Sequence, residues 1–335
     1  MPRMTRRERR KTKRTTSTSQ PIIPIKVEKK EDKQDYTHRG NRGKFFNWYG
    51  KNLKKMMILP LIMVVFAIVM IIFQTATTGS FVNKGISLTG GQTITVTHEG
   101  LDATLVETTL RQEYPAADIG VRVLSEFGTQ KGLIIESSLD APLDGILQIM
   151  MQWVPDVKEN YSVETIGSSL SEGFFREILI ALLIAFIFMS IVVFVLFRTL
   201  WPSLAIIAAA LGDMIFAVAI INLFGIKLST AGIAALLMLI GYSVDTDILL
   251  TTRILRAKRG DFLERTKKAM ATGLTMTGTA LGVVIVGLIF AESDVLRQIF
   301  TILLIGLIAD LPFTWIQNVT ILKIYMDKKS KKSKG

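Results

Sequence analysis

The sequence predicts an α-helical membrane protein with six transmembrane helices and one α+β domain outside the membrane. Apolar residues make up 49% of the 335 residues and charged residues only 20%, and the mean hydropathy is +0.40. Six stretches are long and apolar enough to cross a bilayer, for which about 20 residues are needed. A polar segment between the first two stretches is long enough to fold as a small domain.

The six apolar stretches define the expected organisation of the chain. They lie at residues 56–73, 178–197, 203–224, 229–250, 274–290 and 295–316. The first one follows a long polar arm and is too long for the core of a signal peptide, so we expect no cleavable signal. The expected parts are an arm at 1–55, a first span at 56–73, a domain at 81–172, five spans within 178–326 and a tail at 327–335.

Net charge alternates along the chain in step with these spans. Residues 1–55 carry a net charge of +13, residues 81–172 of −8, residues 252–268 of +5 and residues 323–335 of +5. Basic segments next to spans remain on the cytoplasmic side. We therefore expect a multi-pass protein of the cell membrane with both termini in the cytoplasm and residues 81–172 outside. The overall charge of +12 then reflects topology and contact with membrane lipids, and not nucleic-acid binding.

The basic arm at 1–55 contains two kinds of segment. Residues 15–24 are rich in Ser, Thr and Pro and are predicted to be disordered. Just before the first span, aromatic and basic residues alternate, which is typical of an anchor at the level of the lipid headgroups. The members of this anchor are Lys44, Phe45, Phe46, Trp48, Tyr49, Lys51, Lys54 and Lys55.

The segment at 81–172 is predicted to be a ferredoxin-like domain. Residues 92–97, 118–124, 132–136 and 161–166 have strand patterns, and residues 102–114 and 141–153 have helical patterns. The resulting order βαββαβ is that of a ferredoxin-like sandwich. Three glycines, Gly85, Gly90 and Gly91, precede the first strand but lack the spacing of a phosphate loop. We interpret them as a tight turn leading into that strand.

The composition excludes several kinds of chemistry. The chain contains no Cys and only two His, His38 and His98. Disulfides, thiolate nucleophiles, Cys/His zinc sites and His-dependent triads are therefore not expected. We expect neither a catalytic site nor a metal nor a cofactor.

Four aspartates lie inside the predicted spans, where an ionisable residue is a functional candidate by default. Asp213 lies roughly 15 Å along the third span, near the midplane of the bilayer. Asp245 and Asp247 lie roughly 6–9 Å from the cytoplasmic end of the fourth span. Asp310 lies in the sixth span beside Pro312, where it is a candidate for structural hydrogen bonding to hydroxyls or to backbone groups that the proline leaves free.

These residues leave three interpretations open. Burial in hydrocarbon disfavours the charged form of a carboxyl group, so two neighbouring aspartates can hold and exchange a proton as a relay. The alternative is purely structural hydrogen bonding. A third interpretation is an intramembrane aspartyl protease, because residues 210–213 read ALGD and come close to the motif GxGD. The first glycine of that motif is replaced by Ala210, and Tyr242 stands three residues before Asp245.

Several motifs in order resemble the SecD/SecF family of the resistance-nodulation-division superfamily. Residues 85–91, GISLTGG, resemble the family motif GxDxxGG. Gly212 and Asp213, residues 223–226 (LFGI), 234–237 (AALL) and 240–243 (IGYS) follow SecF in order. Residues 242–253, YSVDTDILLTTR, resemble the archaeal form of that segment. The matching positions include Gly85, Gly90, Gly91, Gly241, Tyr242, Ser243 and Arg253.

The resemblance implies an accessory subunit that promotes protein export together with SecD and the Sec translocon, coupled in bacteria to proton flow. It implies that the outside domain contacts the translocating polypeptide or SecD. Asp213 matches the aspartate of the third span, and the proton-linked aspartate of the fourth span falls at Thr246, between Asp245 and Asp247. A membrane-proximal arginine of the family falls at Lys268, and the acid of GxD falls at Ser87. The proton-relay candidates are therefore Asp213, Asp245, Asp247 and Lys268.

A small-molecule exporter of the same superfamily is the alternative function. Such exporters usually have two large outside domains per chain, whereas the pattern here predicts one. We therefore expect the chain to act with a second subunit.

Overall fold

The computed structural model describes residues 44–126, 129–256, 260–291 and 293–332. These residues belong to a compact unit that begins at Lys44. The disorder predicted for residues 15–24, and the rest of the arm up to residue 43, lie outside the described residues.

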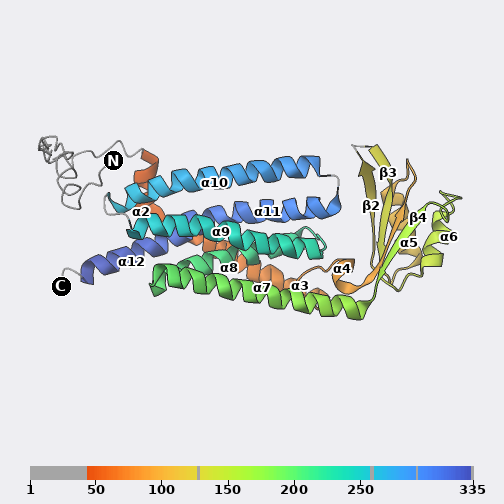
Figure 1. The fold of residues 1–335 in the computed structure, drawn as a ribbon, viewed down its shortest axis with the longest axis horizontal. Coiled ribbons are helices and arrows are strands. Elements are labelled where there is room, and N and C mark those ends of the chain that lie inside the picture. Colours follow the sequence, from red (N-terminus) through yellow and green to blue (C-terminus); the bar gives the residue numbers. More distant parts are fainter. Residues whose placement is uncertain (1–43, 127–128, 257–259, 292, 333–335) are drawn as a thin grey trace, which may run out of the picture. The chain divides into compact units, whose positions relative to one another are not determined.

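Six helices in this part of the chain are long and apolar enough to cross a membrane, as the sequence predicts (Figure 1). Their bounds are α3 (Ile58–Thr78), α7 (Ser168–Phe197), α8 (Leu200–Leu223), α9 (Thr230–Arg256) and α10 (Phe262–Phe290), followed by a last helix in three parts. Its parts are α11 (Asp294–Pro312), the π-helical segment η1 (Phe313–Asn318) and α12 (Val319–Lys332).

Several helices extend well beyond the apolar stretches that predict them. α7 begins at Ser168 and not at residue 178, and α10 begins at Phe262 and not at residue 274. Hydropathy detects only the part of a helix that lies in hydrocarbon, whereas backbone hydrogen bonding continues into the polar layers on either side.

The predicted headgroup anchor forms a helix, α2 (Lys44–Met56), that packs partly on protein. Tyr49 and Leu53 are buried against residues of α9 and of the last helix. The Tyr49 hydroxyl donates a hydrogen bond to the Trp315 carbonyl oxygen. Trp48 is exposed, so one face of α2 remains available to the membrane interface, whereas its other face docks on the helices.

The domain between α3 and α7, called the outside domain because it lies outside the helical part of the protein, contains four strands and two main helices in the predicted order. They are β1 (Gly91–Val96), α5 (Ala103–Glu113), β2 (Ile119–Glu126), β3 (Thr129–Ser137), α6 (Leu143–Met150) and β4 (Tyr161–Ile166). The strands form one sheet in the order β2-β3-β1-β4, and every neighbouring pair is antiparallel.

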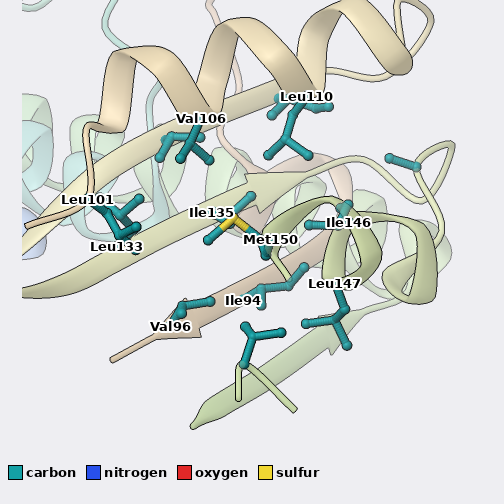
Figure 2. Packing of buried hydrophobic residues seen from close by; sticks show 14 of the residues in the cluster. Ile94, Val96, Leu101, Val106, Leu110, Leu133, Ile135, Ile146, Leu147 and Met150 are labelled. Atoms are coloured by element: carbon teal, nitrogen blue, oxygen red, sulfur yellow. The ribbon is translucent and has the colours of Figure 1, made fainter. Parts of the chain in front are cut away.

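One face of this sheet carries the hydrophobic core of the domain (Figure 2). Ile94 of β1 pairs with Ile135 of β3, and both side chains are fully buried. Leu110 of α5 and Met150 of α6 pack into the same cluster. Both helices therefore cover the same face of the sheet. α5 begins after Asp102, whose carboxylate accepts a hydrogen bond of 2.9 Å from the Thr104 backbone N–H, which is typical of an N-cap.

Residues 85–91 form a helical turn, α4 (Ile86–Thr89), between Gly85 and Gly90. Gly90 has φ +83°, and a Cβ atom there would lie 2.6 Å from the Cα atom of Ser168. Only glycine fits where the chain enters β1 against the start of α7. The prediction that these glycines form a turn into the first strand is confirmed.

Candidate functional site

Three aspartates from three helices meet inside the helical part of the protein. Asp213 lies on α8, Asp247 on α9 and Asp310 on α11, and their exposed fractions are 0%, 0% and 1%. Asp213 and Asp310 both bond to the same stretch of α9, through the hydroxyls of Ser243 and Thr246 respectively. Asp310, expected to be a structural acid beside a proline, therefore lies within the same cluster as the two relay candidates.

Hydroxyl and amide groups join the three carboxyl groups into one network. The Ser243 hydroxyl donates to the carboxylate of Asp213, and the Thr246 hydroxyl lies 3.1 Å from Asp310 Oδ2. The Thr314 hydroxyl lies 2.8 Å from Asp310 Oδ1 and 2.9 Å from Asp247 Oδ1. The Thr246 hydroxyl also lies 2.9 Å from the Ser243 carbonyl oxygen. The network therefore runs from Asp213, near the middle of α8, through Ser243 and Thr246 to Asp310, and from there through Thr314 to Asp247 on α9.

The network ends at an amide group on the π-helical segment. Asn318 donates a hydrogen bond of 2.7 Å from Nδ2 to Asp247 Oδ1. Pro312 precedes this segment and has no backbone N–H to donate, and π-helical turns often occur at functional sites. Asp310, Thr314 and Asn318 are spaced four residues apart, so they lie along one face of the last helix.

The close approach of α8 to the last helix depends on a glycine. A Cβ atom at Gly212 would lie 2.6 Å from Phe313 Cε1. Gly212 therefore lets the aromatic ring at the start of η1 pack directly against α8. This contact brings Asp213, the next residue, beside Asp310.

The cluster contains acids and no base. Within the described part of the chain, these three aspartates are the charged residues that are buried. Asp213 Oδ1 and Asp247 Oδ2 have no hydrogen-bond partner there, and an unpartnered buried polar atom is costly. Three neighbouring carboxylates would repel one another, and no cation is buried among the described residues to compensate their charge. The arrangement is therefore suited to carboxyl groups that bind protons.

Asp245 does not join this cluster. It lies on an exposed face of α9 and lines a groove of about 500 Å³ between α9, α10 and α11. Most of the groove is apolar, and Tyr242, which is 43% exposed, lies on the same face. Gly241 is also on the exposed side of α9, and no atom lies within 4 Å of the position of a Cβ there.

The structure also does not bring Lys268 to the carboxyl groups. Its Nζ atom lies 2.8 Å from Glu264 Oε1, and its side chain is 69% exposed. Arg253 donates a hydrogen bond to the Lys268 carbonyl oxygen. The Arg253 bond joins the end of α9 to α10, whereas the Lys268 ammonium pairs within α10, which gives no support for Lys268 as a relay residue.

Thr314 and Asn318 are site residues that the sequence analysis missed. The signal was present, because polar residues at 310, 314 and 318 interrupt an otherwise apolar stretch with helical spacing. Ser243 was named only as a family position, and its hydrogen bond to Asp213 supplies the physical reason for a hydroxyl there.

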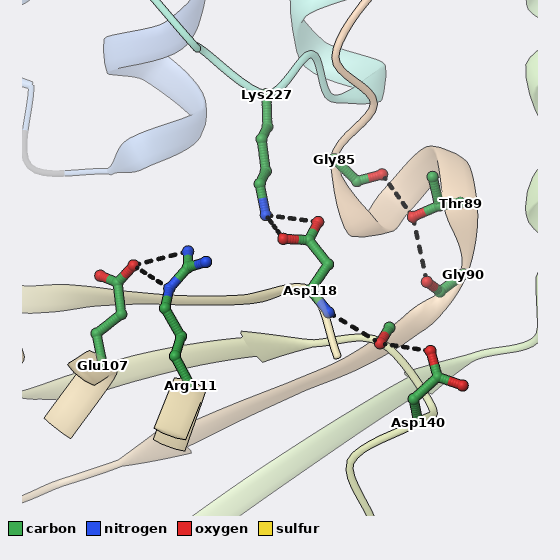
Figure 3. A network of polar contacts seen from close by, with 9 residues as sticks. Gly85, Thr89, Gly90, Glu107, Arg111, Asp118, Asp140 and Lys227 are labelled. Carbon is green, nitrogen blue, oxygen red and sulfur yellow. Dashed lines mark hydrogen bonds and ion pairs between the residues drawn. The ribbon is translucent and has the colours of Figure 1, made fainter. Parts of the chain in front are cut away.

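The turn between α8 and α9 contacts the outside domain (Figure 3). The Lys227 ammonium lies 2.7 Å from both carboxylate oxygens of Asp118. Next to it, the Gly85 backbone N–H donates a hydrogen bond of 2.8 Å to the Leu228 carbonyl oxygen. The helices that carry Asp213 and Asp247 therefore both end at a turn that is bonded to the outside domain.

These features define a multi-pass membrane protein with one α+β domain outside its helices and a buried acidic cluster within them. The family model for the C-terminal part of the protein export membrane proteins SecD and SecF matches residues 147–328. The SecF protein of Pyrococcus furiosus is 39% identical over 279 residues, which cover 83% of this chain and 93% of that protein. SecF of Methanocaldococcus jannaschii is 39% identical over 286 residues, covering 82% and 96%.

The chain therefore belongs to the SecF family of protein-export membrane proteins, as the sequence motifs indicate. This gives it an accessory role in protein export by the Sec pathway. The fold is similar to that of SecDF from Thermus thermophilus, with a TM-score of 0.66 and 18% identity. That match covers 86% of this chain but only 39% of the SecDF chain.

The hydroxyl that bridges two carboxyl groups gives a direct test of the network. Replacing Thr314 by Val keeps the shape of the side chain but removes the hydroxyl that lies between Asp247 and Asp310, so the bridge between the two carboxyl groups is lost. We expect the free energy of unfolding to fall by about 1–3 kcal/mol, measured by denaturant titration of the purified protein in detergent. Thr314→Ser keeps the hydroxyl and is the matched control. Equal losses for both variants would show that the hydroxyl is not what matters.

Proposed function

We propose that this protein promotes polypeptide export by coupling proton binding at Asp213, Asp247 and Asp310 to movement of the outside domain. The observation that carries the proposal is the single hydrogen-bonded network that joins the three buried carboxyl groups across α8, α9 and the last helix. Intramembrane carboxyl groups that lack a basic partner are typical of proton pathways.

The hydrogen-bonding capacity of the network supports proton exchange. A protonated carboxyl group donates one hydrogen bond, whereas a carboxylate only accepts. Gain or loss of a proton at Asp213 or Asp310 therefore changes which groups can bond to Ser243, Thr246 and Thr314. A relay requires two such arrangements of the helices that differ in proton affinity.

The junction with the outside domain supports the coupling step. α8 and α9 carry two of the three aspartates, and the turn between them bonds to Asp118 and Gly85. The Lys227–Asp118 ion pair is partly exposed, with 31% and 57% of the two side chains accessible. Exposed pairs of this kind contribute little stability, so the contact orients the domain without locking it.

Replacement of the three aspartates by asparagine tests the proton role. Asparagine keeps the size of each side chain and one of its acceptor oxygens but cannot exchange a proton at neutral pH. We expect Asp213→Asn, Asp247→Asn and Asp310→Asn together to lower the rate of export to that of cells lacking the protein, measured by pulse-chase of a secreted protein. Asp327→Asn, at an exposed position on α12, is the control and should export normally.

A second measurement distinguishes proton coupling by the three aspartates from a purely structural role. The chain has no Cys, so spin labels at Asp144→Cys and Phe224→Cys report the distance between the outside domain and the helices without background. We expect this distance to shift when a pH gradient is imposed on proteoliposomes, and the triple asparagine variant to show no shift. Normal export by that variant would reject the proton role while leaving the accessory role intact.

We propose SecD as the partner that covers the groove lined by Asp245. An acid exposed on a membrane-spanning helix needs a donor from a neighbour, and the SecDF chain is much longer than this one. We expect SecD to co-purify with the chain, and Asp245→Leu to reduce its recovery more than Asp245→Asn, which still bonds a donor. Equal recovery with both variants would place the SecD contact elsewhere.

We further propose that the end of the helices opposite the sheet faces the cytoplasm. Lys54, Arg253, Arg265 and Lys328 lie at that end, in agreement with the positive-inside rule, and the acidic outside domain lies at the other. A membrane-impermeant maleimide should label Asp144→Cys in intact cells, whereas protection of that residue would show the opposite orientation.

The βαββαβ order and the strand order β2-β3-β1-β4 support assignment of this domain to the ferredoxin-like class.

A further inference from the structure

α8 and α12 leave an apolar groove between them at the end of the helices remote from the sheet. The groove has a volume of about 360 Å³. Four residues of each helix line it, namely Trp201, Leu204, Ala205 and Ala208 of α8 and Ile321, Ile324, Tyr325 and Lys328 of α12. α8 runs toward the outside domain and α12 runs away from it, so the two helices are antiparallel.

The sequence explains why a groove forms here. On both helices the lining residues have the spacing i, i+3, i+4, i+7, so each set lies on one face. The two faces extend for roughly 10 Å along their helices. Because Ala205 and Ala208 have small side chains, a space remains open between α8 and Ile321.

One end of the groove is positively charged and aromatic. The Lys328 ammonium lies 5.9 Å from the centroid of the Trp201 ring, and the Trp201 side chain is 60% exposed. Arg198 is exposed in the turn just before α8, and the side chain of Thr199 does not cap the first turn of that helix. The positive end of the α8 dipole therefore adds to the charges of Arg198 and Lys328.

We propose that this groove binds one anionic phospholipid, with one of its acyl chains along Ala208 and Ile321 and its phosphate beside Lys328 and the first turn of α8. Trp and Lys side chains of this kind occur at the level of the headgroups, and basic pockets between membrane helices bind anionic lipid headgroups. The apolar part of the groove then lies at the depth of the acyl chains. Charge complementarity favours an anionic lipid over a zwitterionic one.

A lipid fits this site better than a helix of a partner protein. A helix with its side chains is about 10 Å across, whereas the groove is a narrow space between two helices that are already in contact. It also lies on α8 and α12, away from the groove between α9, α10 and α11 that we assign to SecD. The proposal does not depend on proton binding by the aspartates.

Quenching of Trp201 fluorescence tests the proposal. The full-length chain is reconstituted in vesicles of phosphatidylcholine and phosphatidylglycerol, with one lipid at a time brominated in its acyl chains. The Trp201 signal is the difference between this chain and Trp201→Phe. We expect phosphatidylglycerol to occupy the site about fivefold more strongly than phosphatidylcholine, as one lysine near the membrane surface provides. Lys328→Gln should reduce this preference, and Lys328→Gln combined with Arg198→Gln should reduce it further.

Two further variants make the result decisive. Lys331→Gln removes an exposed charge from the same helix outside the groove and should keep the preference. Ala208→Phe fills the groove from an exposed position and should reduce quenching by both lipids. Equal quenching by the two lipids in the original chain would overturn the proposal, as would a preference that is undiminished in Lys328→Gln. Absence of quenching by either lipid would show that protein covers the groove.

Discussion

The cost of placing carboxyl groups in a medium without water governs this structure. Asp213, Asp247 and Asp310 are removed from solvent, where an isolated charge is disfavoured. Each one is instead bonded to hydroxyl or amide groups that come from a different helix or from the next turn. These bonds bring α8, α9 and the last helix together at one point. The position of three membrane-spanning helices thus depends on satisfying three acids.

This constraint has consequences at both ends of the helices. Toward the outside domain, α8 and α9 lead into the turn that bonds to Asp118 and Gly85. Toward the opposite end, the last helix continues through the π-helical segment into α12, which carries one wall of the lipid groove. The three aspartates in the middle are therefore connected by continuous helices to the domain and to the proposed lipid site. Close packing depends on glycine at two points, where Gly90 lies against the start of α7 and where Gly212 lies against Phe313.

Much of the architecture could be predicted because its signals are local. Apolar length indicates which segments can span a membrane. Alternating and helical patterns predicted the four strands and two helices of the outside domain, with boundaries that differ by only a few residues. The predicted helix ends were least accurate where helices leave the hydrocarbon, as at Ser168 and Phe262. Hydropathy falls at these points although the helix continues.

The sequence by itself determined that the chain has six segments long and apolar enough to cross a membrane and that four aspartates lie within them. Two residues along a helix correspond to a rotation of about 200°, so Asp245 and Asp247 had to point to nearly opposite faces. Only the tertiary structure decided that Asp247 points inward and Asp245 outward, and that Asp310 and not Lys268 completes the cluster. The physical reason is that a local pattern shows which residues share a face, whereas the neighbour that covers this face depends on contacts between segments far apart in the chain.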